Sequence, residues 1–279
     1  AGSTGYVVEP YLVTGDQGMP VWKDEDLFAE IEKFDRMGLG ITGHATGDAA
    51  NRQLIDAFAY VKEKYGELKG RHQLAHGTMI HPEDIPRLKD LDLTSEFSPV
   101  FWYPGPFPDA QRAQLGDDRM NGWYPINSVA KSGGRVTLAS DGPLYWHGPL
   151  SVMETAITRK APSGVGEALN PHEAIGLATA IKAMTLNSAY VMNQENTVGS
   201  IEVGKRADMI VLDNNLFEIP VEEIGKSTVQ ITVFNGKVVY DAAVNPTTEK
   251  AIEKEYNVEL DLESGPGHHG SFKGYHAHY

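Results

Sequence analysis

The sequence predicts an α/β fold in which parallel strands alternate with helices and form half of a (β/α)8 barrel. Apolar segments of strand length alternate four times with segments of helical periodicity before residue 160. Polar residues able to bind a metal directly follow several of these short apolar segments, as they do where parallel strands end at the active-site rim of a barrel. A closed barrel needs eight strand–helix units, so four units predict half of one.

The predicted units follow one another in a regular order. Residues 24–38 carry apolar side chains at helical spacing, and Gly38 ends this helix before the first strand. Strand–helix alternation predicts a parallel sheet with the helices outside it. The predicted strands and the helices that follow them are strand 39–44 with a helix from Asp48, strand 72–76 with helix 82–89, strand 93–98 with helix 121–132, and strand 135–140 with helix 149–159.

The pattern changes in the C-terminal part of the chain. Residues 171–193 have helical periodicity, and three short β segments follow, with Asn235-Gly236 as the hairpin turn between the last two. These segments are 207–212, 229–234 and 237–240. We therefore predict a partial barrel over 1–195, a β segment over 196–240, and a C-terminal extension and tail over 241–279.

Three residues form a candidate metal-ligand set, namely His44, His76 and Asp141. Each follows a predicted strand, and neutral imidazoles with a carboxylate suit a catalytic zinc ion or a similar divalent metal. Asp141 is also the candidate catalytic residue, because a carboxylate at a metal can accept a proton from water. The alternative is that the histidines bind backbone in loops and that Asp141 belongs to a turn before Gly142.

A second group of residues is expected around these candidate ligands, either contacting the substrate or holding the ligands in place. Strand alternation puts His72 on the same face as His76. Asp48 can instead cap a helix, Arg159 can form a helix salt bridge, and the apolar stretch around Trp102 can cover the core and not wall a pocket. The group consists of His72, Asp48, Trp102, Trp146, His147 and Arg159.

The composition excludes several classes of partner. A formal net charge of −14 argues against nucleic acid, because phosphate contacts need a basic face. No apolar run approaches the roughly 18 residues that a membrane helix needs, and the absence of cysteine excludes thiolate ligands and disulfides. A soluble protein with a small-molecule substrate remains, in either the cytoplasm or the periplasm.

Four motifs, in order, resemble the YtcJ-like branch of the amidohydrolase superfamily. They are the segments 44–48, 71–76, 140–143 and 156–159, and the segment 199–213 with 235–240 resembles the part of the superfamily that returns to a small β-sandwich. The resemblance implies a (β/α)8 barrel, or TIM barrel, in which one or two divalent ions, zinc by expectation, activate water to hydrolyse a non-peptide C–N bond. Branch members include deformylases of N-substituted formamides.

The resemblance also implies roles for individual residues. His44 matches the fifth-strand histidine, His76 the sixth-strand histidine and Asp141 the eighth-strand aspartate. In the family these residues bind metal, and the aspartate takes a proton from the attacking water. On this basis residues 1–195 hold strands five to eight with their helices, and residues 196–240 are the return segment to the sandwich.

Two departures from the family pattern motivate alternatives. Ala75 stands where the branch usually has an acidic residue, and the first-strand His-x-His and the fourth-strand ligand would lie upstream of Ala1. We therefore expect the C-terminal portion of a longer enzyme, inactive alone, that forms a homo-oligomer or associates with its missing N-terminal half through unpaired sheet edges. The alternatives are a non-catalytic binding or regulatory protein on the same fold, and ester or lactone hydrolysis at the same metal.

Overall fold

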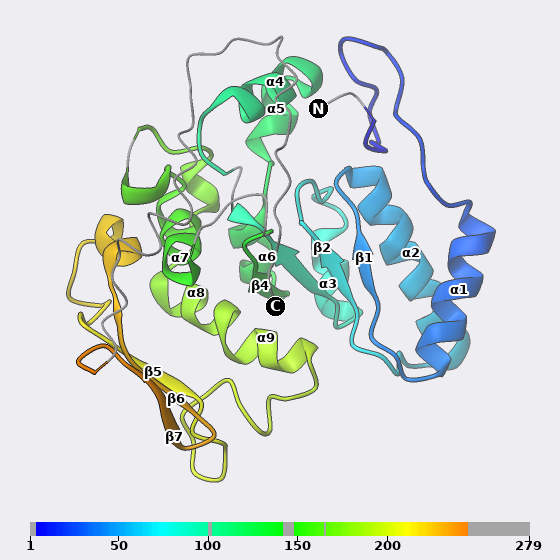
Figure 1. Ribbon diagram of the computed structural model, residues 1–279. Coiled ribbons are helices and arrows are strands. Elements are labelled where there is room, and N and C mark those ends of the chain that lie inside the picture. Colours follow the sequence, from blue (N-terminus) through cyan, green and yellow to red (C-terminus); the bar gives the residue numbers. More distant parts are fainter. Residues whose placement is uncertain (1–3, 100–101, 142–147, 165, 245–279) are drawn as a thin grey trace, which may run out of the picture. The chain divides into compact units, whose positions relative to one another are not determined.

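The computed structural model describes residues 4–99, 102–141, 148–164 and 166–244. Its centre is a four-stranded sheet in the order β1-β2-β3-β4, in which every neighbouring pair is parallel (Figure 1). The strands are β1 (Thr42–His44), β2 (Gln73–Ala75), β3 (Thr94–Phe97) and β4 (Arg135–Leu138). The predicted α/β fold with a parallel sheet is therefore confirmed.

Helices connect successive strands and pack against the sheet. Helix α1 (Asp24–Arg36) packs against α2 (Asp48–Tyr65), and both lie beside β1 (Figure 1). Gly43 permits the close approach of α2, because a Cβ at this position would lie 2.5 Å from Leu54 Cδ1. The remaining helices of the described residues are α3 (Ile85–Asp90), α4 (Pro106–Leu115), α5 (Asp117–Asn121), α6 (Ile126–Lys131), α7 (Pro149–Thr158), α8 (Leu177–Met184), α9 (Leu186–Val191) and the 3-10 turns η2 (Pro162–Gly164), η3 (Pro171–Glu173) and η4 (Val221–Lys226).

The core lies between the sheet and these helices. Leu74 of β2 is fully buried, as are Ile55 and Phe58 of α2. A second part of the core is aromatic, where Phe97 at the end of β3 contacts Trp102 edge to face at 5.7 Å between ring centroids. Removal of this apolar surface from water fixes the register of the sheet, since a shift by one residue would exchange its two faces.

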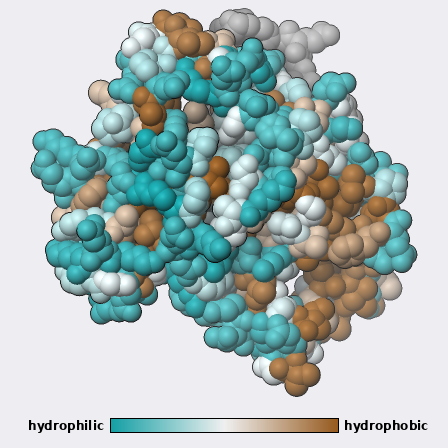
Figure 2. Space-filling model, turned by 180° about the vertical axis from the view of Figure 1, so that it is seen from behind, coloured by the Kyte–Doolittle hydropathy of each residue, from teal (hydrophilic) through white to brown (hydrophobic). Residues whose placement is uncertain are grey.

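A second, three-stranded sheet has the order β5-β6-β7. Strand β5 (Met209–Leu212) runs antiparallel to β6 (Val229–Phe234), and β7 (Lys237–Asp241) follows a two-residue turn. Both turn residues, Asn235 and Gly236, have positive φ (49° and 75°), as this hairpin turn type requires. The predicted hairpin is confirmed. Apolar residues gather on the surface over this sheet (Figure 2), and the exposed ones are Ile210, Val211, Phe234, Val238 and Val239.

Several predicted elements differ from the structure. No helix was predicted between residues 98 and 121, but residues 106–115 form helix α4, whose N-terminus holds Pro106, a residue suited to the first helical turn. Of the helix expected over 121–132, only α6 forms, because α5 ends at Asn121 and residues 122–125 between the two are not helical. Helical structure over 171–193 is interrupted at Thr185, whose φ of −120° and ψ of −89° are not helical.

No helix among the described residues is both long and apolar enough to cross a membrane. Residues 241–279 form a separate unit, of which only 241–244 are described. The rest of the predicted tail lies outside the described residues.

Candidate functional site

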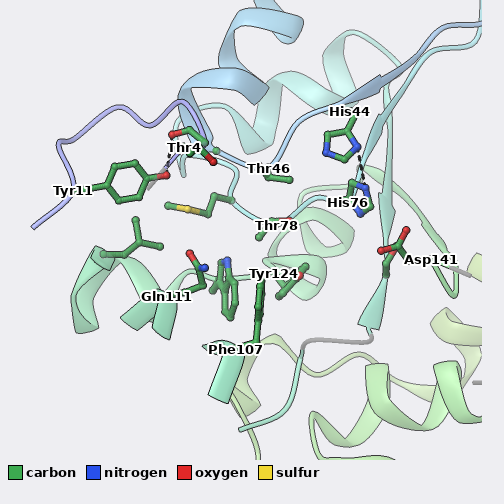
Figure 3. Close-up of a pocket in the computed structure, with 16 residues that line it drawn as sticks. Thr4, Tyr11, His44, Thr46, His76, Thr78, Phe107, Gln111, Tyr124 and Asp141 are labelled. Carbon is green, nitrogen blue, oxygen red and sulfur yellow. Dashed lines mark hydrogen bonds between the residues drawn. The ribbon is translucent and has the colours of Figure 1, made fainter. Parts of the chain in front are cut away.

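Two histidines from neighbouring strands meet at the carboxyl end of the parallel sheet. His44 is the last residue of β1 and pairs in register with Ala75, the last residue of β2, so His76 directly follows the end of β2. The Nδ1 atom of His44 and the Nε2 atom of His76 are 3.1 Å apart, and the rings meet edge to face with centroids 4.4 Å apart (Figure 3). The structure thus brings together two residues separated by 32 positions in the sequence.

His76 reaches this position through an unusual backbone conformation. Its φ is 77°, in the left-handed region that only a few per cent of residues other than glycine adopt. Strand alternation would instead place His76 on the helix side of the sheet with Leu74 and His72. The expectation that His72 and His76 share a face is therefore wrong, because the left-handed residue ends the alternation and aims His76 at His44.

Asp141 lies in the same pocket as the two histidines (Figure 3). It comes three residues after β4 and also has a positive φ, 52°. Such conformations cost about 1–3 kcal/mol each and persist where the surrounding structure enforces them, often at active sites. The three predicted ligands therefore converge on one rim, and two of them do so through backbone conformations of this kind.

Glu96 is a fourth polar group at this rim that sequence reasoning did not select. Its Oε1 accepts a hydrogen bond from Ser98 Oγ at 2.7 Å, and its Oε2 accepts one from the backbone N–H of His76 at 3.4 Å. The signal was present in the sequence, because Thr94, Glu96 and Ser98 form a polar stripe on one face of a predicted strand.

The local electrostatics favour neutral imidazole at His44. Burial lowers the pKa of His44, the positive charge of a protonated His76 lowers it further, and the carboxylates of Asp141 and Glu96 partly oppose both effects. Neutral imidazole is the form that binds metal, because a protonated ring nitrogen has no lone pair to donate. The ring is therefore suited to a metal or to hydrogen bonding at neutral pH.

The pocket has a volume of about 400 Å³, and its wall opposite the histidines is largely aromatic. Phe107 of α4 stacks on Trp123 with 5.9 Å between the ring centroids, and the Trp123 and Tyr124 ring centroids are 5.0 Å apart. Tyr11 reaches in from the N-terminal loop, where its hydroxyl donates to the carbonyl of Gly5 at 2.8 Å. Phe107 belongs to the apolar stretch around Trp102, for which a pocket wall was one of the two expectations, and it does line the pocket. Pocket residues that sequence reasoning missed are Tyr11, Thr46, Thr78, Gln111, Trp123 and Tyr124.

The spacing of the two histidine nitrogens suits a shared metal ion, but the number of donors at the site falls short of a full ligand set. Zinc–nitrogen bonds of about 2.0–2.1 Å at tetrahedral angles place two imidazole nitrogens about 3.3–3.4 Å apart, a few tenths of an ångström more than the 3.1 Å between His44 Nδ1 and His76 Nε2. However, the described residues contain no group of three or more histidine, aspartate or glutamate side chains that could hold a metal. The pair offers two donors, and Asp141 lines the same pocket without completing a three-donor cluster.

His72 lies outside this pocket and is tied to the opposite end of the sheet. Its Nε2 is 2.9 Å from Asp35 Oδ1, its Nδ1 accepts the N–H of Ile41 at 3.2 Å, and its ring stacks on Phe58 at 4.5 Å. Burial lowers the pKa of His72, and the Asp35 carboxylate opposes this. These contacts are those of a structural residue joining α1, β1 and β2.

Asp48 is also not among the residues that line the pocket. Gly47 is the N-cap residue of α2, so the expected cap at Asp48 is wrong by one position. As the first residue of the helix, Asp48 accepts hydrogen bonds from the N–H groups of Val8 at 2.9 Å and Ala49 at 3.0 Å. It thereby holds the N-terminal loop on the helix start.

Arg159 and Trp102 are both fully buried, and neither lines the pocket. The guanidinium lies 4.8 Å from the Trp102 ring centroid and donates from Nε to the carbonyl of Leu169 at 2.8 Å. Burial lowers the pKa of Arg159 to about 10, partly offset by Glu173. Among the described residues Arg159 forms no ion pair, so the expected helix salt bridge is not found there. Trp146 and His147 lie outside the described residues.

Comparison with known proteins gives a family match over most of the chain. The Amidohydrolase family matches residues 1–240. The chain is 30% identical over 243 residues to "Putative amidohydrolase YtcJ" of Bacillus subtilis (strain 168), covering 86% of this chain and 45% of that protein. It is 27% identical over 210 residues to "N-substituted formamide deformylase" of Arthrobacter pascens, covering 75% and 38% respectively. The chain therefore spans less than half the length of these relatives.

Solved structures give the same fold. An uncharacterized metal-dependent hydrolase from Pyrococcus horikoshii OT3 superposes with a TM-score of 0.67 at 22% identity, covering 78% of this chain and 43% of that protein. A second such hydrolase, from Pyrococcus furiosus, superposes with a TM-score of 0.61 at 23% identity over 74% of this chain and 40% of that protein. Both comparisons support the α/β architecture described above.

Proposed function

Since the chain belongs to the amidohydrolase family, we propose that it is part of a metal-dependent hydrolase that cleaves a non-peptide C–N bond of an amide or formamide type. The proposed cofactor is a divalent metal ion, zinc by preference, held by His44 and His76 with Asp141 beside it. Relatives are named as an N-substituted formamide deformylase and as a deaminase, and both names imply cleavage of a C–N bond, which supports this class of reaction.

One observation carries this proposal. His44 Nδ1 and His76 Nε2 are 3.1 Å apart in a pocket that Asp141 also lines. Imidazole and carboxylate ligands are the donor set of many catalytic zinc sites, and no thiolate competes with them because the chain has no cysteine. The aromatic wall of the pocket supplies apolar surface for the organic part of a substrate.

In the proposed mechanism, a bound divalent ion would supply Lewis acidity, lowering the pKa of water and polarising the substrate carbonyl. The Asp141 carboxylate accepts a proton from the attacking water, whose oxygen adds to the carbonyl carbon. When the C–N bond breaks, Asp141 returns that proton to the departing nitrogen. The lowered pKa of His44 keeps its imidazole neutral and available as a donor during these steps.

We propose further that the four-stranded sheet is the C-terminal half of a (β/α)8 barrel, with the second sheet as part of a small sandwich domain. The sheet order leaves one side of β1 and one side of β4 without a neighbouring strand among the described residues. Because unpaired strand edges favour association, we propose that these edges pair with the remaining strands of the barrel or with another copy. Additional metal ligands would come from that source.

Elemental analysis and an activity assay on the same preparation test this function. We expect zinc or another divalent metal to be bound, and we expect hydrolysis of N-substituted formamides or simple amides once the barrel is complete. Weaker metal binding together with loss of turnover in His44→Ala and His76→Ala supports the proposal. Full turnover in both variants contradicts it.

A second candidate is a binding or regulatory protein on the same fold. It is favoured by the lack of a three-donor metal cluster in the part of the chain that the structure describes. Such a protein would bind a substrate analogue in the aromatic pocket but would not convert substrate, with or without added zinc. Turnover that depends on Asp141 excludes it.

A further inference from the structure

Glu96 occupies the same lateral row of the sheet as His44. The register pairs His44 with Ala75, Leu74 with Ser95, and Glu96 with Thr137. Extending the β2–β3 register by one residue places Ala75 beside Glu96. Side chains in one lateral row of a parallel sheet point to the same face, so Glu96 shares the face of His44.

Both oxygens of the Glu96 carboxylate have a hydrogen-bond donor. Ser98 Oγ donates to Oε1 at 2.7 Å, and the backbone N–H of His76 donates to Oε2 at 3.4 Å. The serine thus fixes the orientation of the carboxylate from one side. In this orientation the Oε2 atom of Glu96 lies toward His76, the residue with the left-handed backbone conformation.

The His76 N–H needs such an acceptor because of its backbone conformation. At a φ of 77° this residue has left the strand geometry, and β2 ends at Ala75. A carboxylate is the stronger kind of acceptor for this N–H, since hydrogen bonds to charged groups are about twice as strong as neutral ones. The bond therefore stabilises the turn that directs the imidazole toward His44.

Among the described residues, Glu96 forms no ion pair with lysine, arginine or histidine. A part-buried carboxylate without a cationic partner is costly. A cation bound between the two histidines would reduce that cost.

We infer that Glu96 is a positioning residue for the histidine pair: it accepts the His76 N–H, holds that imidazole against His44, and supplies negative charge that favours a divalent cation there. The second part of this inference rests on the proposed function. The first part concerns the backbone of His76 and is independent of any metal.

The test compares four variants of the full chain by two measurements. The variants are Glu96→Gln, Glu96→Ala, the exchange Ala75→Glu with Glu96→Ala, and Glu83→Gln, whose side chain is 80% exposed and serves as the matched control. Nuclear magnetic resonance of the His76 backbone amide measures the hydrogen bond. Titration with Co²⁺ alone measures the affinity of the histidine pair for a cation.

We expect Glu96→Ala to speed hydrogen exchange of the His76 amide and to weaken Co²⁺ binding about 10- to 100-fold, the usual range for residues that support a metal ligand. Glu96→Gln keeps an acceptor but loses the charge, so it should preserve most of the amide protection while weakening Co²⁺ binding. The exchange variant returns a carboxylate to the neighbouring position in the row and should recover much of the affinity. Glu83→Gln should change neither measurement.

Two other results are decisive in different ways. If the hydrogen-exchange rate of the His76 amide is unchanged in both Glu96→Ala and Glu96→Gln, the inference is overturned, whatever the Co²⁺ titrations show. If His44→Ala and His76→Ala leave Co²⁺ binding unchanged, the metal site of the proposed function fails, and the amide measurement alone then decides the role of Glu96. Should Glu96→Ala fail to fold, Glu96→Gln with its altered Co²⁺ affinity still tests the charge.

Discussion

The two ends of the parallel sheet use the same residue types in opposite ways. At the amino end, His72 and Asp35 are almost completely buried and in contact. At the carboxyl end, His44 and His76 contact each other in an open pocket, with Asp141 as a third member of its lining. A histidine close to a carboxylate does not by itself indicate a functional site. The two ends of the sheet differ in whether these side chains already have hydrogen-bond partners within the protein.

At the amino end of the sheet, the Asp35 carboxylate accepts several hydrogen bonds from the protein. Asp35 accepts hydrogen bonds from the N–H groups of Lys69 at 2.7 Å and Gly70 at 2.9 Å, besides its contacts with Arg36 and His72. Burial raises the pKa of Asp35, but the hydrogen bonds from these donors outweigh burial and lower it. The carboxyl end instead places two left-handed residues around a cavity. This contrast separates a structural cluster from a candidate active site.

The largest expected effect is a loss of turnover caused by a substitution at the carboxyl end of the sheet that leaves the fold intact. In the complete enzyme, Asp141→Asn should reduce turnover about 10²- to 10⁴-fold, because the amide keeps the size of the side chain but cannot accept the proton. Asparagine tolerates the left-handed conformation, so the unfolding temperature should stay close to that of the parent. Steady-state kinetics and thermal unfolding measure the two effects. A nearly normal turnover rejects the proton-transfer role of Asp141.

The next largest effect is a loss of stability caused by a substitution at the amino end of the sheet. Asp35→Ala should lower the free energy of unfolding by about 3 kcal/mol, since it leaves a buried histidine and two backbone N–H groups without their acceptor. Urea unfolding measures the change. Asp117→Ala is the matched control, because its carboxylate is 84% exposed and pairs with Arg112 at the surface, so a change within about 0.5 kcal/mol is expected. Equal effects of the two substitutions would show that the amino-end cluster is not structural.

A smaller effect is the pH dependence of stability in the metal-free protein. Burial lowers the pKa of both His44 and His72, so the folded protein binds fewer protons than the unfolded chain just below the unfolded value of about 6.5. Stability is therefore expected to fall as the pH is lowered from about 6.5 toward the folded pKa values. His44→Gln should flatten this dependence with little loss of stability at pH 8.

The same experiment on His72 sharpens the comparison of the two ends. His72→Gln should also flatten the pH dependence, but it should lower stability at pH 8 as well, because it disturbs the contacts with Asp35 and Phe58. Urea unfolding from pH 5.5 to 8 measures both variants. If His44→Gln proves as destabilising at pH 8 as His72→Gln, the distinction between the two clusters is lost.

Sequence reasoning predicted the sheet, because hydrophobic periodicity and chain order determine a parallel arrangement. It also predicted the convergence of His44, His76 and Asp141, because their positions follow from the strand ends. It could not predict the left-handed turn at His76, since alternation alone assigns this residue to the other face. The fit of a metal to these side chains stays a proposal.

Other features depended on tertiary contacts that a single sequence does not reveal. Arg159 donates to the backbone carbonyls of Leu169, Tyr124 and Trp123, so neither an ion pair nor a substrate was needed to explain it. Helix α4 was not predicted from its proline-containing segment, although Pro106 stands where a helix tolerates it. Glu96 was visible as a polar residue in a strand, but its role depends on the neighbouring strand.

The measurement that tests the central claim most directly is X-ray absorption at the zinc edge on the protein loaded with Zn²⁺. We expect two imidazole nitrogens at about 2.0–2.1 Å from the zinc, one fewer in each of His44→Ala and His76→Ala, and no change in His72→Gln. A zinc environment without imidazole, or one that survives both alanine substitutions unchanged, would contradict the assignment of His44 and His76 as a metal-binding pair.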